Sequence, residues 1–207
     1  MERMDNTPAI SQEAADAILL DVRPPQGRWR EFDYLWLTDR CNRFVEFADG
    51  HLEELPSLTD LHQSILLFLF RRFDESVRAE GGVALVGPLR LKIREERFRE
   101  PDLLLLRDAS DSRRQNRFWL GADLVVEVVS PDDPERDYVR KRHDYATARI
   151  SEYWIVDPQR DEITVMNLEH GRYVERGTFG IQESASSSIL DGFNVEVSEA
   201  LQPDDID

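Results

Sequence analysis

The spacing of hydrophobic residues changes several times along this 207-residue chain, and each change predicts a new element. From residue 43, apolar and polar residues alternate on both sides of Asp49-Gly50, a pair typical of tight turns, so residues 43–55 predict a β-hairpin. Apolar residues then recur at helical spacing from Leu61 to Phe73, and Gly81-Gly82 ends that helix. The residues that can cap its first turn are Ser57, Thr59 and Asp60.

Short apolar runs dominate the rest of the chain and predict β-strands. Residues 101–106 and 124–129 are almost unbroken Leu and Val, which is typical of central strands covered on both faces. After them, Asp133-Pro134 predicts the start of a helix that continues to about residue 149, whereas residues 184–188 are predicted to form a loop. The other predicted strands are 83–86, 89–93, 152–156, 163–167, 173–176 and 193–197.

The order of these elements predicts an α/β fold with a central mixed β-sheet flanked by helices. A chain of this length suits one domain, which we place at residues 37–201, with the β-hairpin near its start. Residues 1–36 are predicted to form an N-terminal arm, with a short helix at the apolar patch 14–20. Residues 202–207 form an acidic tail.

The composition restricts the possible functions. The net charge of −16 repels polyanions and argues against a nucleic-acid partner, although arginines cluster at 94–99, 113–117 and 136–142, so a local basic surface is compatible with this total. No apolar stretch is long enough to span a membrane and the N-terminus lacks a secretion signal, which predicts a cytoplasmic protein. Cys41 is the single cysteine, which excludes an internal disulfide and a multi-cysteine zinc site.

One acid interrupts the apolar run at 124–129. Strand alternation places Glu127 on the same face as Val125 and Val129, and a buried carboxylate is costly unless a cation or hydrogen bonds compensate for it. Asp102 opens the preceding strand, and Mg²⁺ or Mn²⁺ is typically held by one or two carboxylates together with water and substrate phosphate. Asp102 and Glu127 therefore predict a metal site. The alternatives are a buried ion pair between Glu127 and an arginine, and a purely structural role for Asp102 at the start of a strand.

Lys141 follows this pair in the predicted helix. Only two of the 26 basic residues are lysines, and in such an arginine-rich chain this favours a specific role for Lys141. Helical spacing places Lys141 on one face with Tyr138 and Tyr145, and a lysine beside a metal can orient the attacking water. The alternative is an exposed ion pair of Lys141 with Asp137 or Asp144.

These segments together closely resemble the Uma-two family, which belongs to the PD-(D/E)xK, restriction-endonuclease-like superfamily. Residues 44–50, with His62 in the following helix, are similar to the family's N-terminal signature, and the resemblance covers residues 37–201. The segments that carry it are Pro101-Asp102, Asp-Leu-Val-Val-Glu-Val-Val-Ser-Pro at 123–131, Arg136-Asp137, Lys-Arg-His-Asp-Tyr-Ala at 141–146 and Glu-Tyr-Trp-Ile-Val-Asp-Pro at 152–158.

The resemblance implies a restriction-endonuclease-like core in which Asp102 and Glu127 bind the metal. It also implies that Glu46 lies near the metal and that His62 and Tyr145 are neighbours in the pocket. The wider superfamily has a lysine two positions after the second acid, where this chain has Val129, and Lys141 occupies the matching place on the next helix. A solvent-facing strand position remains the alternative for Glu46, and a hydrogen-bonded structural role remains the alternative for His62.

The expected function is that of an endonuclease that depends on Mg²⁺ or Mn²⁺ and hydrolyses phosphodiester bonds, with DNA favoured over RNA. One alternative is a non-catalytic protein that retains the nuclease fold and forms a homodimer through a hydrophobic edge at Tyr153-Trp154. Another is a metal-dependent phosphoesterase that acts on small substrates. A homodimer is expected in the catalytic case as well.

Overall fold

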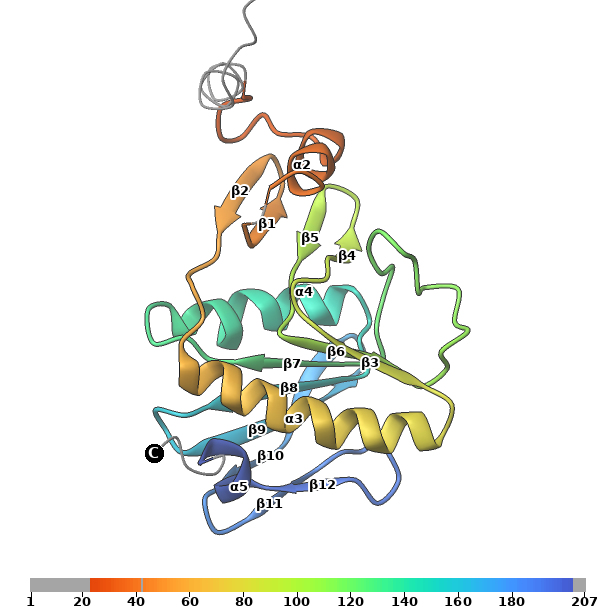
Figure 1. The fold of residues 1–207 in the computed structure, drawn as a ribbon, viewed down its shortest axis with the longest axis vertical. Coiled ribbons are helices and arrows are strands. Elements are labelled where there is room, and N and C mark those ends of the chain that lie inside the picture. Colours follow the sequence, from red (N-terminus) through yellow and green to blue (C-terminus); the bar gives the residue numbers. More distant parts are fainter. Residues whose placement is uncertain (1–22, 42, 203–207) are drawn as a thin grey trace, which may run out of the picture.

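A six-stranded mixed sheet forms the centre of the computed structural model, which describes residues 23–41 and 43–202 (Figure 1). Its central pair, β7 and β8, is parallel, and every other neighbouring pair is antiparallel. The predicted mixed sheet is therefore confirmed. In spatial order its strands are β10 (Arg172–Gly180), β9 (Glu162–Glu169), β8 (Glu152–Asp157), β7 (Leu124–Val128), β6 (Leu103–Leu106) and β3 (Val83–Val86).

Helices cover both faces of this sheet, as the unbroken apolar strands predict. The long helix α3 (Asp60–Ala79) packs on one face together with the short α5 (Val197–Leu201), while a π-helical turn, η1 (Arg136–Lys141), and α4 (Arg142–Thr147) lie over the other (Figure 1). Along β7 the side chains alternate between the two layers, because Val126 packs in the α3 core and Val125 in the α4 core. Glu127 consequently belongs to the α4 face.

The local sequence explains where α3 begins and ends. Of the three candidate caps, Thr59 is the N-cap, and its side-chain oxygen accepts a hydrogen bond of 3.2 Å from the backbone N–H of His62. The helix ends at Ala79, and Gly81 adopts a left-handed φ of 90°, which glycine reaches without a steric penalty. The cap fixes the first turn of α3, and that turn carries His62.

A second, four-stranded sheet stands at one end of the molecule, in the order β2 (His51–Glu54), β1 (Val45–Ala48), β5 (Arg97–Arg99) and β4 (Leu91–Arg94). The predicted hairpin is confirmed, with Ala48 opposite His51 and positive φ values at both Asp49 and Gly50. The apolar run predicted as a strand at 89–93 is β4, which pairs in this sheet. β5 was missed because its sequence, Arg-Phe-Arg, resembles an exposed segment.

Helix α2 (Glu31–Thr38) packs on this smaller sheet, although residues 29–36 fall within the predicted arm. Tyr34 is fully buried and stacks on Phe47 at 5.2 Å between ring centroids, and Trp29 joins the same cluster. The folded part of the chain thus extends upstream of residue 37. The predicted short helix at 14–20 and residues 203–207 of the predicted tail lie outside the described residues.

The C-terminal segment differs from its prediction. Residues 184–188 were predicted as a loop and 193–197 as a strand of the central sheet, whereas β11 (Ser184–Ser186) and β12 (Asn194–Glu196) form a separate two-stranded sheet. In β11 only Ala185 is buried, and it packs in the α3 core together with Val195, while the residues on either side of it are serines. The strand period is therefore not visible in the sequence.

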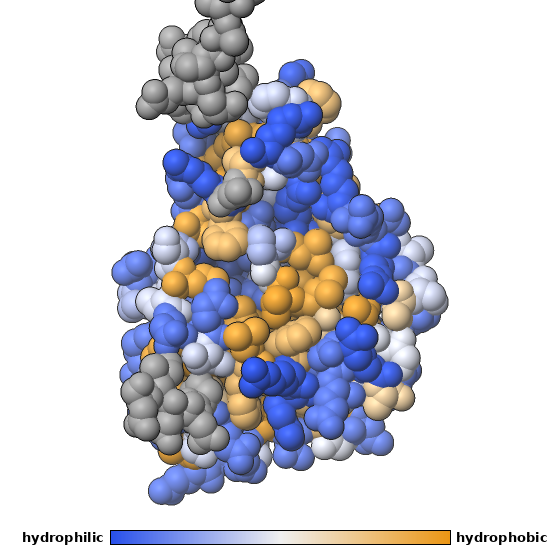
Figure 2. Space-filling view, viewed as in Figure 1, coloured by the Kyte–Doolittle hydropathy of each residue, from blue (hydrophilic) through white to orange (hydrophobic). Residues whose placement is uncertain are grey.

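Tyr153 and Trp154 do not form a hydrophobic edge. Their strand, β8, lies between β7 and β9, and both side chains are fully buried on opposite faces of the sheet. Apolar side chains do show on the face crossed by α3, where Leu61 and Leu67 are exposed (Figure 2). None of the helices in the described part of the chain is long and apolar enough to cross a membrane.

Candidate active site

Glu127 is buried on β7 and meets donors from η1 and α4. The Nζ atom of Lys141 lies 2.7 Å from Glu127 Oε2, and the hydroxyl of Tyr145 donates to Glu127 Oε1. Both carboxylate oxygens are therefore compensated, as the cost of burying a charge requires. The ion pair is formed with a lysine and not with the arginine that the structural alternative assumed.

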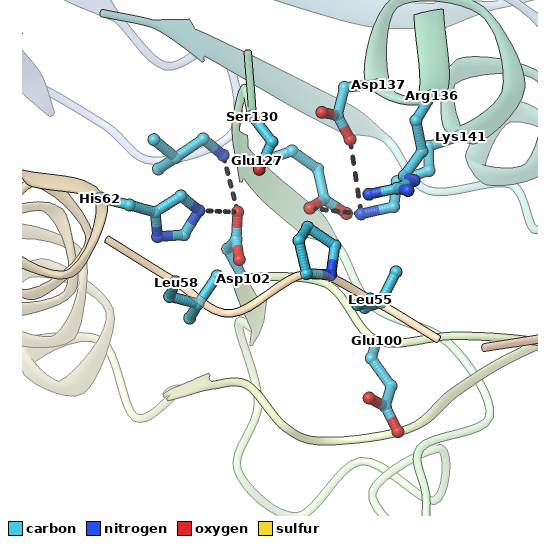
Figure 3. A pocket seen from close by; sticks show the side chains of 12 residues that line it. Leu55, Leu58, His62, Glu100, Asp102, Glu127, Ser130, Arg136, Asp137 and Lys141 are labelled. Carbon is cyan, nitrogen blue, oxygen red and sulfur yellow. Dashed lines mark hydrogen bonds and ion pairs between the residues drawn. The ribbon is translucent and has the colours of Figure 1, made fainter. Parts of the chain in front are cut away.

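Asp102 lies at the start of β6 and is held by two neighbours on one oxygen. The backbone N–H of Val128 donates to Asp102 Oδ2 at 2.7 Å, and the Nε2 atom of His62 is 3.2 Å from the same oxygen (Figure 3). The other oxygen, Oδ1, carries neither contact. Because Val128 directly follows Glu127, its N–H fixes Asp102 beside the second acid. The Nδ1 atom of His62 is buried and has no partner in the described part of the chain.

The π-helical turn of η1 determines what Lys141 contacts. Its ammonium lies 3.4 Å from Asp137 and 3.8 Å from Glu46, in addition to Glu127, and the lysine side chain is only 5% exposed. A π-helical turn is wider than an α-helical turn and changes which neighbours share a face, and such turns are frequent at functional sites. The alternative pairing of Lys141 with Asp137 is thus present, but it is a buried contact within the site and not an exposed pair.

Tyr138 does not join this group, contrary to the prediction from α-helical spacing. Its hydroxyl donates to Asp157 at 2.9 Å, and the guanidinium of Arg160 lies over its ring at 4.9 Å. The predicted neighbour Tyr145 does contact Glu127, from a fully buried position in α4 behind the cavity wall. Of the two tyrosines, one therefore orients a site carboxylate and the other binds the end of β8.

Glu46 and Arg99 form a second layer behind Lys141. Glu46 is fully buried on β1, accepts from the backbone N–H of Glu100 at 3.0 Å and is paired with the Nη1 atom of Arg99. Arg99 in turn donates to Asp144 at 2.8 Å through its Nε atom. Glu46 therefore does not face solvent, and it reaches the site through Lys141 and through the backbone of Glu100.

The acids face a small cavity of about 30 Å³ (Figure 3). Its wall contains four carboxylates and the ammonium group, with Arg136 beside them. Of these residues, Glu100, Arg136 and Asp137 were not assigned to the site by sequence, although Glu100 and Asp137 each lie close in sequence to a predicted site residue. The lining residues are Leu55, Pro56, Leu58, His62, Glu100, Asp102, Glu127, Val128, Ser130, Arg136, Asp137 and Lys141.

The pKa shifts reflect an excess of negative charge. Burial raises the pKa of Glu127 well above its ordinary value even though Lys141 opposes the shift, and burial raises the pKa of Asp137 in the same way. Burial would lower the pKa of Lys141, but the surrounding carboxylates, Glu127 first, outweigh it and hold the pKa above the ordinary value. Burial, together with the charge of Glu46, also raises the pKa of Glu100 to about 8. One ammonium thus faces more carboxylates than it can neutralise.

Two acids keep low pKa values in this setting. Burial would raise the pKa of Asp102, but the hydrogen bond and charge of His62 lower it overall. For His62, burial would lower the pKa, but the hydrogen bond and charge of Asp102 raise it overall. Burial also acts against ionisation of Glu46, yet Lys141 and Arg99 together lower its pKa. Asp102 is therefore the cavity acid best prepared to remain charged.

These residues fit a hard divalent cation as a partial ligand set. In residues 23–41 and 43–202, no three His, Cys, Asp or Glu side chains form a complete cage for an ion. Mg²⁺ does not require such a cage, because it commonly binds one or two carboxylates and completes its shell with water and phosphate. Asp102, through its free oxygen, and Glu127 are the residues that would hold it, and the surplus of carboxylates favours a cation.

Comparison with known proteins identifies the family of this chain. The Uma2 family model, described as "Putative restriction endonuclease", matches residues 29–198. The chain belongs to the Uma2 family. The matched range includes α2 from its start, in agreement with the packing of that helix on the smaller sheet.

A solved structure shares the Uma2 fold at low sequence identity. It is the crystal structure of a protein from Anabaena variabilis ATCC 29413 described as "a putative nuclease belonging to DUF820". The match has a TM-score of 0.66 with 14% identity and covers 81% of this chain and 97% of the other. The predicted α/β fold, with a central mixed sheet flanked by helices, is thus confirmed. No curated protein matches the sequence.

Proposed function

We propose that this Uma2 protein is a divalent-metal-dependent endonuclease that hydrolyses phosphodiester bonds of DNA. The observation that carries the proposal is the convergence of Asp102, Glu127 and Lys141 on one small polar cavity, from two strands and a helix. Membership of the Uma2 family, whose model is described as "Putative restriction endonuclease", supports a nuclease that acts on DNA. The choice of Mg²⁺ or Mn²⁺ follows from the chemistry of the acids.

The cation that the acids would bind supplies a Lewis acid for the phosphoryl oxygen and lowers the pKa of a bound water. The protein's own groups prepare the site. The N–H of Val128 and the ring of His62 both hold one oxygen of Asp102, a cavity-lining residue, and neither group contacts its other oxygen. The hydroxyl of Tyr145 fixes Glu127, so that both acids are held in position before substrate arrives.

Lys141 provides a positive charge at the same place. Its ammonium has three rotatable donors, so it can keep contact with Glu127 while a further N–H holds the attacking water or a phosphate oxygen. Glu46, 3.8 Å away and itself anchored by Arg99, limits the movement of this ammonium. Lys141 would therefore act on the reacting atoms, whereas Glu46 would position it.

The test is cleavage of supercoiled plasmid by purified protein with Mg²⁺ or Mn²⁺ and with EDTA. We expect nicked and linear products only with metal, and a loss of at least about 100-fold in rate for Asp102→Asn, since one metal ligand is removed. The matched control is Asp74→Asn, which removes the same charge from an ion pair with Arg78 farther along α3. Equal activity of Asp102→Asn and wild type would show a contaminating nuclease and refute the assignment.

Two further readouts separate the alternatives. Release of nitrophenol from bis-p-nitrophenyl phosphate, with plasmid left intact, would identify a phosphoesterase for small substrates. Calorimetric titration with Mn²⁺ is expected to show binding that Glu127→Gln weakens. Absence of Mn²⁺ binding in wild type would favour the non-catalytic interaction protein.

A further inference from the structure

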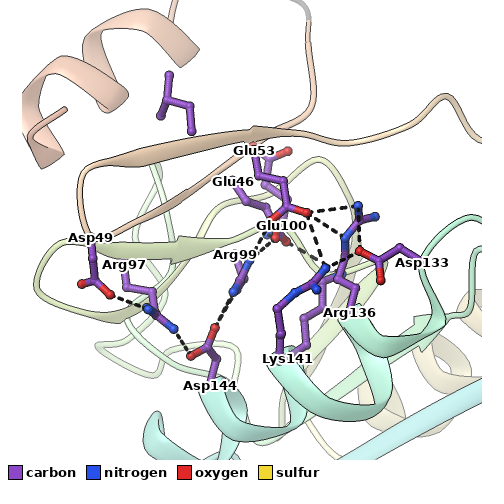
Figure 4. A network of polar contacts seen from close by, with 12 residues as sticks. Glu46, Asp49, Glu53, Arg97, Arg99, Glu100, Asp133, Arg136, Lys141 and Asp144 are labelled. Carbon is purple, nitrogen blue, oxygen red and sulfur yellow. Dashed lines mark hydrogen bonds and ion pairs between the residues drawn. The ribbon is translucent and has the colours of Figure 1, made fainter. Parts of the chain in front are cut away.

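Two arginines of η1, Arg136 and Arg140, are held by carboxylates from outside this turn. Figure 4 shows Arg136 close to Glu53 and Asp133. Arg136 lines the cavity, and its guanidinium contacts Glu53 on β2 at 3.1 Å through Nη2 and 3.2 Å through Nε. Arg140, one helical turn further on, lies 3.7 Å from the same Glu53 oxygen and is paired with Asp133. Glu53 thus joins the smaller sheet to the active-site helix.

Three guanidinium groups lie close to Glu53, because Arg99 is 3.9 Å from its second oxygen. Each of them also has another carboxylate neighbour: Asp133 lies 3.9 Å from Arg136 and is paired with Arg140, and Arg99 is paired with Glu46 and Asp144. Glu53 and Arg140 are both about 40% exposed, so this carboxylate is open to solvent and exchangeable, unlike the buried Glu46. The pair of Glu53 with Arg140 is an exposed one, weak and easily replaced by a competing anion, whereas Arg136 is only 12% exposed, so its pair with Glu53 is partly buried.

Arginine suits a phosphate at this position. Its planar fork of N–H donors matches two oxygens of a phosphate as well as those of a carboxylate. Most other arginines in the clusters noted in the sequence are paired away from the cavity, for example Arg117 with Asp39 and Arg113 with Asp111. Arg136 differs because it shares a wall with Asp102 and Glu127, where a reacting phosphate would lie.

We propose that Arg136 and Arg140 bind the backbone phosphates of the substrate strand next to the reacting phosphate, and that Glu53 occupies this site in the free protein until a phosphate displaces it. The inference rests on the proposed nuclease function and names the residues that hold its substrate. It explains how a chain of net charge −16 accepts a polyanion, because the basic site is neutralised by a replaceable carboxylate and not absent.

A different role for the same contacts is a structural lock between β2 and η1. The two roles predict opposite effects of Glu53→Gln. A lock loses stability and gains no affinity, whereas a phosphate site loses a competitor and binds DNA more tightly.

The test measures binding of a fluorescein-labelled 30-base-pair DNA duplex by fluorescence anisotropy over a series of salt concentrations. Binding is measured in EDTA and with Ca²⁺, and a gel confirms that the duplex stays intact. We expect Glu53→Gln to bind about two- to fivefold more tightly and Arg136→Gln at least about tenfold more weakly. For Arg136→Gln the slope of log K against log salt should fall by about one, as for the loss of one phosphate contact.

Matched controls exclude a general effect of charge. Asp74→Asn and Arg78→Gln change the net charge by the same amounts at a 2.6 Å pair on α3, 12 residues or about 18 Å of helix beyond His62. Both are expected to leave affinity within about twofold of wild type. Arg140→Gln, at a half-exposed position, and Arg136→Lys, which keeps the charge, provide readouts if Arg136→Gln fails to fold by its melting temperature.

The outcomes are distinct from those for catalysis. The inference would be overturned if Arg136→Gln left the affinity and the salt slope unchanged, or if wild type did not bind the duplex. If Arg136→Gln does not fold, the same criterion applies to Arg140→Gln. Weaker binding with a lower melting temperature in Glu53→Gln would identify the structural lock. If wild type binds the duplex through Arg136 but cleaves no DNA with any metal, the proposed function fails while the phosphate site stands.

Discussion

Lys141→Met removes a positive charge that contacts three buried carboxylates. The ammonium lies 2.7 Å from Glu127, 3.4 Å from Asp137 and 3.8 Å from Glu46, and the lysine is almost completely buried. Breaking a buried ion pair by removing one partner costs about 3–5 kcal/mol, since the remaining charges are left uncompensated. We therefore expect the free energy of unfolding in urea, measured at pH 7 with EDTA, to fall by about this amount.

The chain contains a matched control, because Lys92 is its only other lysine. Lys92 pairs with a single acid, Glu31, at 2.6 Å, and its side chain is 26% exposed. Lys92→Met is expected to cost about 0.2–1 kcal/mol, as for a surface pair. Equal costs for the two variants would show that the cluster around Lys141 does not depend on this charge and would refute the reasoning.

The pH dependence provides a second readout for Lys141→Met. Without the ammonium, burial raises the folded-state pKa values of Glu127 and Asp137 further, since Lys141 is the group that opposes those shifts. Acids with raised folded-state pKa values stabilise the fold below their unfolded pKa values, and this contribution is lost as the pH rises through the folded values. The stability lost in Lys141→Met should therefore grow from pH 5 to pH 8. Mn²⁺ should restore part of it, because the cation replaces the missing charge.

Three further changes test other parts of the site. Glu100→Gln should become more stable relative to wild type as the pH rises from about 4.5 to 8 in EDTA. The reason is that the pKa of Glu100 is raised to about 8, so that its ionisation in the folded protein is unfavourable. A stability difference that does not change with pH would contradict this. Tyr145→Phe should reduce plasmid cleavage more than Tyr173→Phe, whose hydroxyl donates only to the backbone of Ile150, and equal activities would exclude a role for the contact with Glu127. Glu46→Gln should lower kcat with little change in KM, since Glu46 reaches the site through Lys141, and an effect on KM alone would place it with substrate binding.

Much of the fold was predictable because its elements follow simple periods. Alternation in β1 and β2, the cap at Thr59 and the unbroken apolar runs of β6 and β7 each specify a local structure, and the structure contains all of them. The smaller sheet was not predictable as a separate unit. Its strand β5 contains Arg99, which is buried only because Glu46 and Asp144 arrive from β1 and α4, and such long-range pairing leaves no local pattern.

In the candidate site, too, features set by local periodicity were predictable and features set by long-range or irregular structure were not. Strand alternation correctly placed Glu127 on one face with Val125 and Val129, without showing which element covers that face. The structure brings Asp102, His62 and Lys141 to the same cavity, while their chemical roles stay predictions. The error concerned Tyr138 and followed from assuming 3.6 residues per turn in η1. In the π-helical turn Asp137, four residues before Lys141, stays near the ammonium, whereas Tyr138 is directed toward Asp157.

The π-helical turn also gives a physical reason for the position of the lysine. A lysine on β7 two residues after Glu127 would share its face of the strand, where the structure has the buried Val129 packed in the α4 core. Lys141 instead comes from η1, which lies over one face of the central sheet, and its ammonium contacts both Glu127 on β7 and Glu46 on β1. It thereby links the two sheets at the cavity, and Arg136 of the same turn contacts Glu53 on β2. A single turn of helix thus positions both the ammonium beside Glu127 and the guanidinium proposed to hold a substrate phosphate. An inserted or deleted residue in η1 is therefore expected to abolish cleavage and DNA binding together.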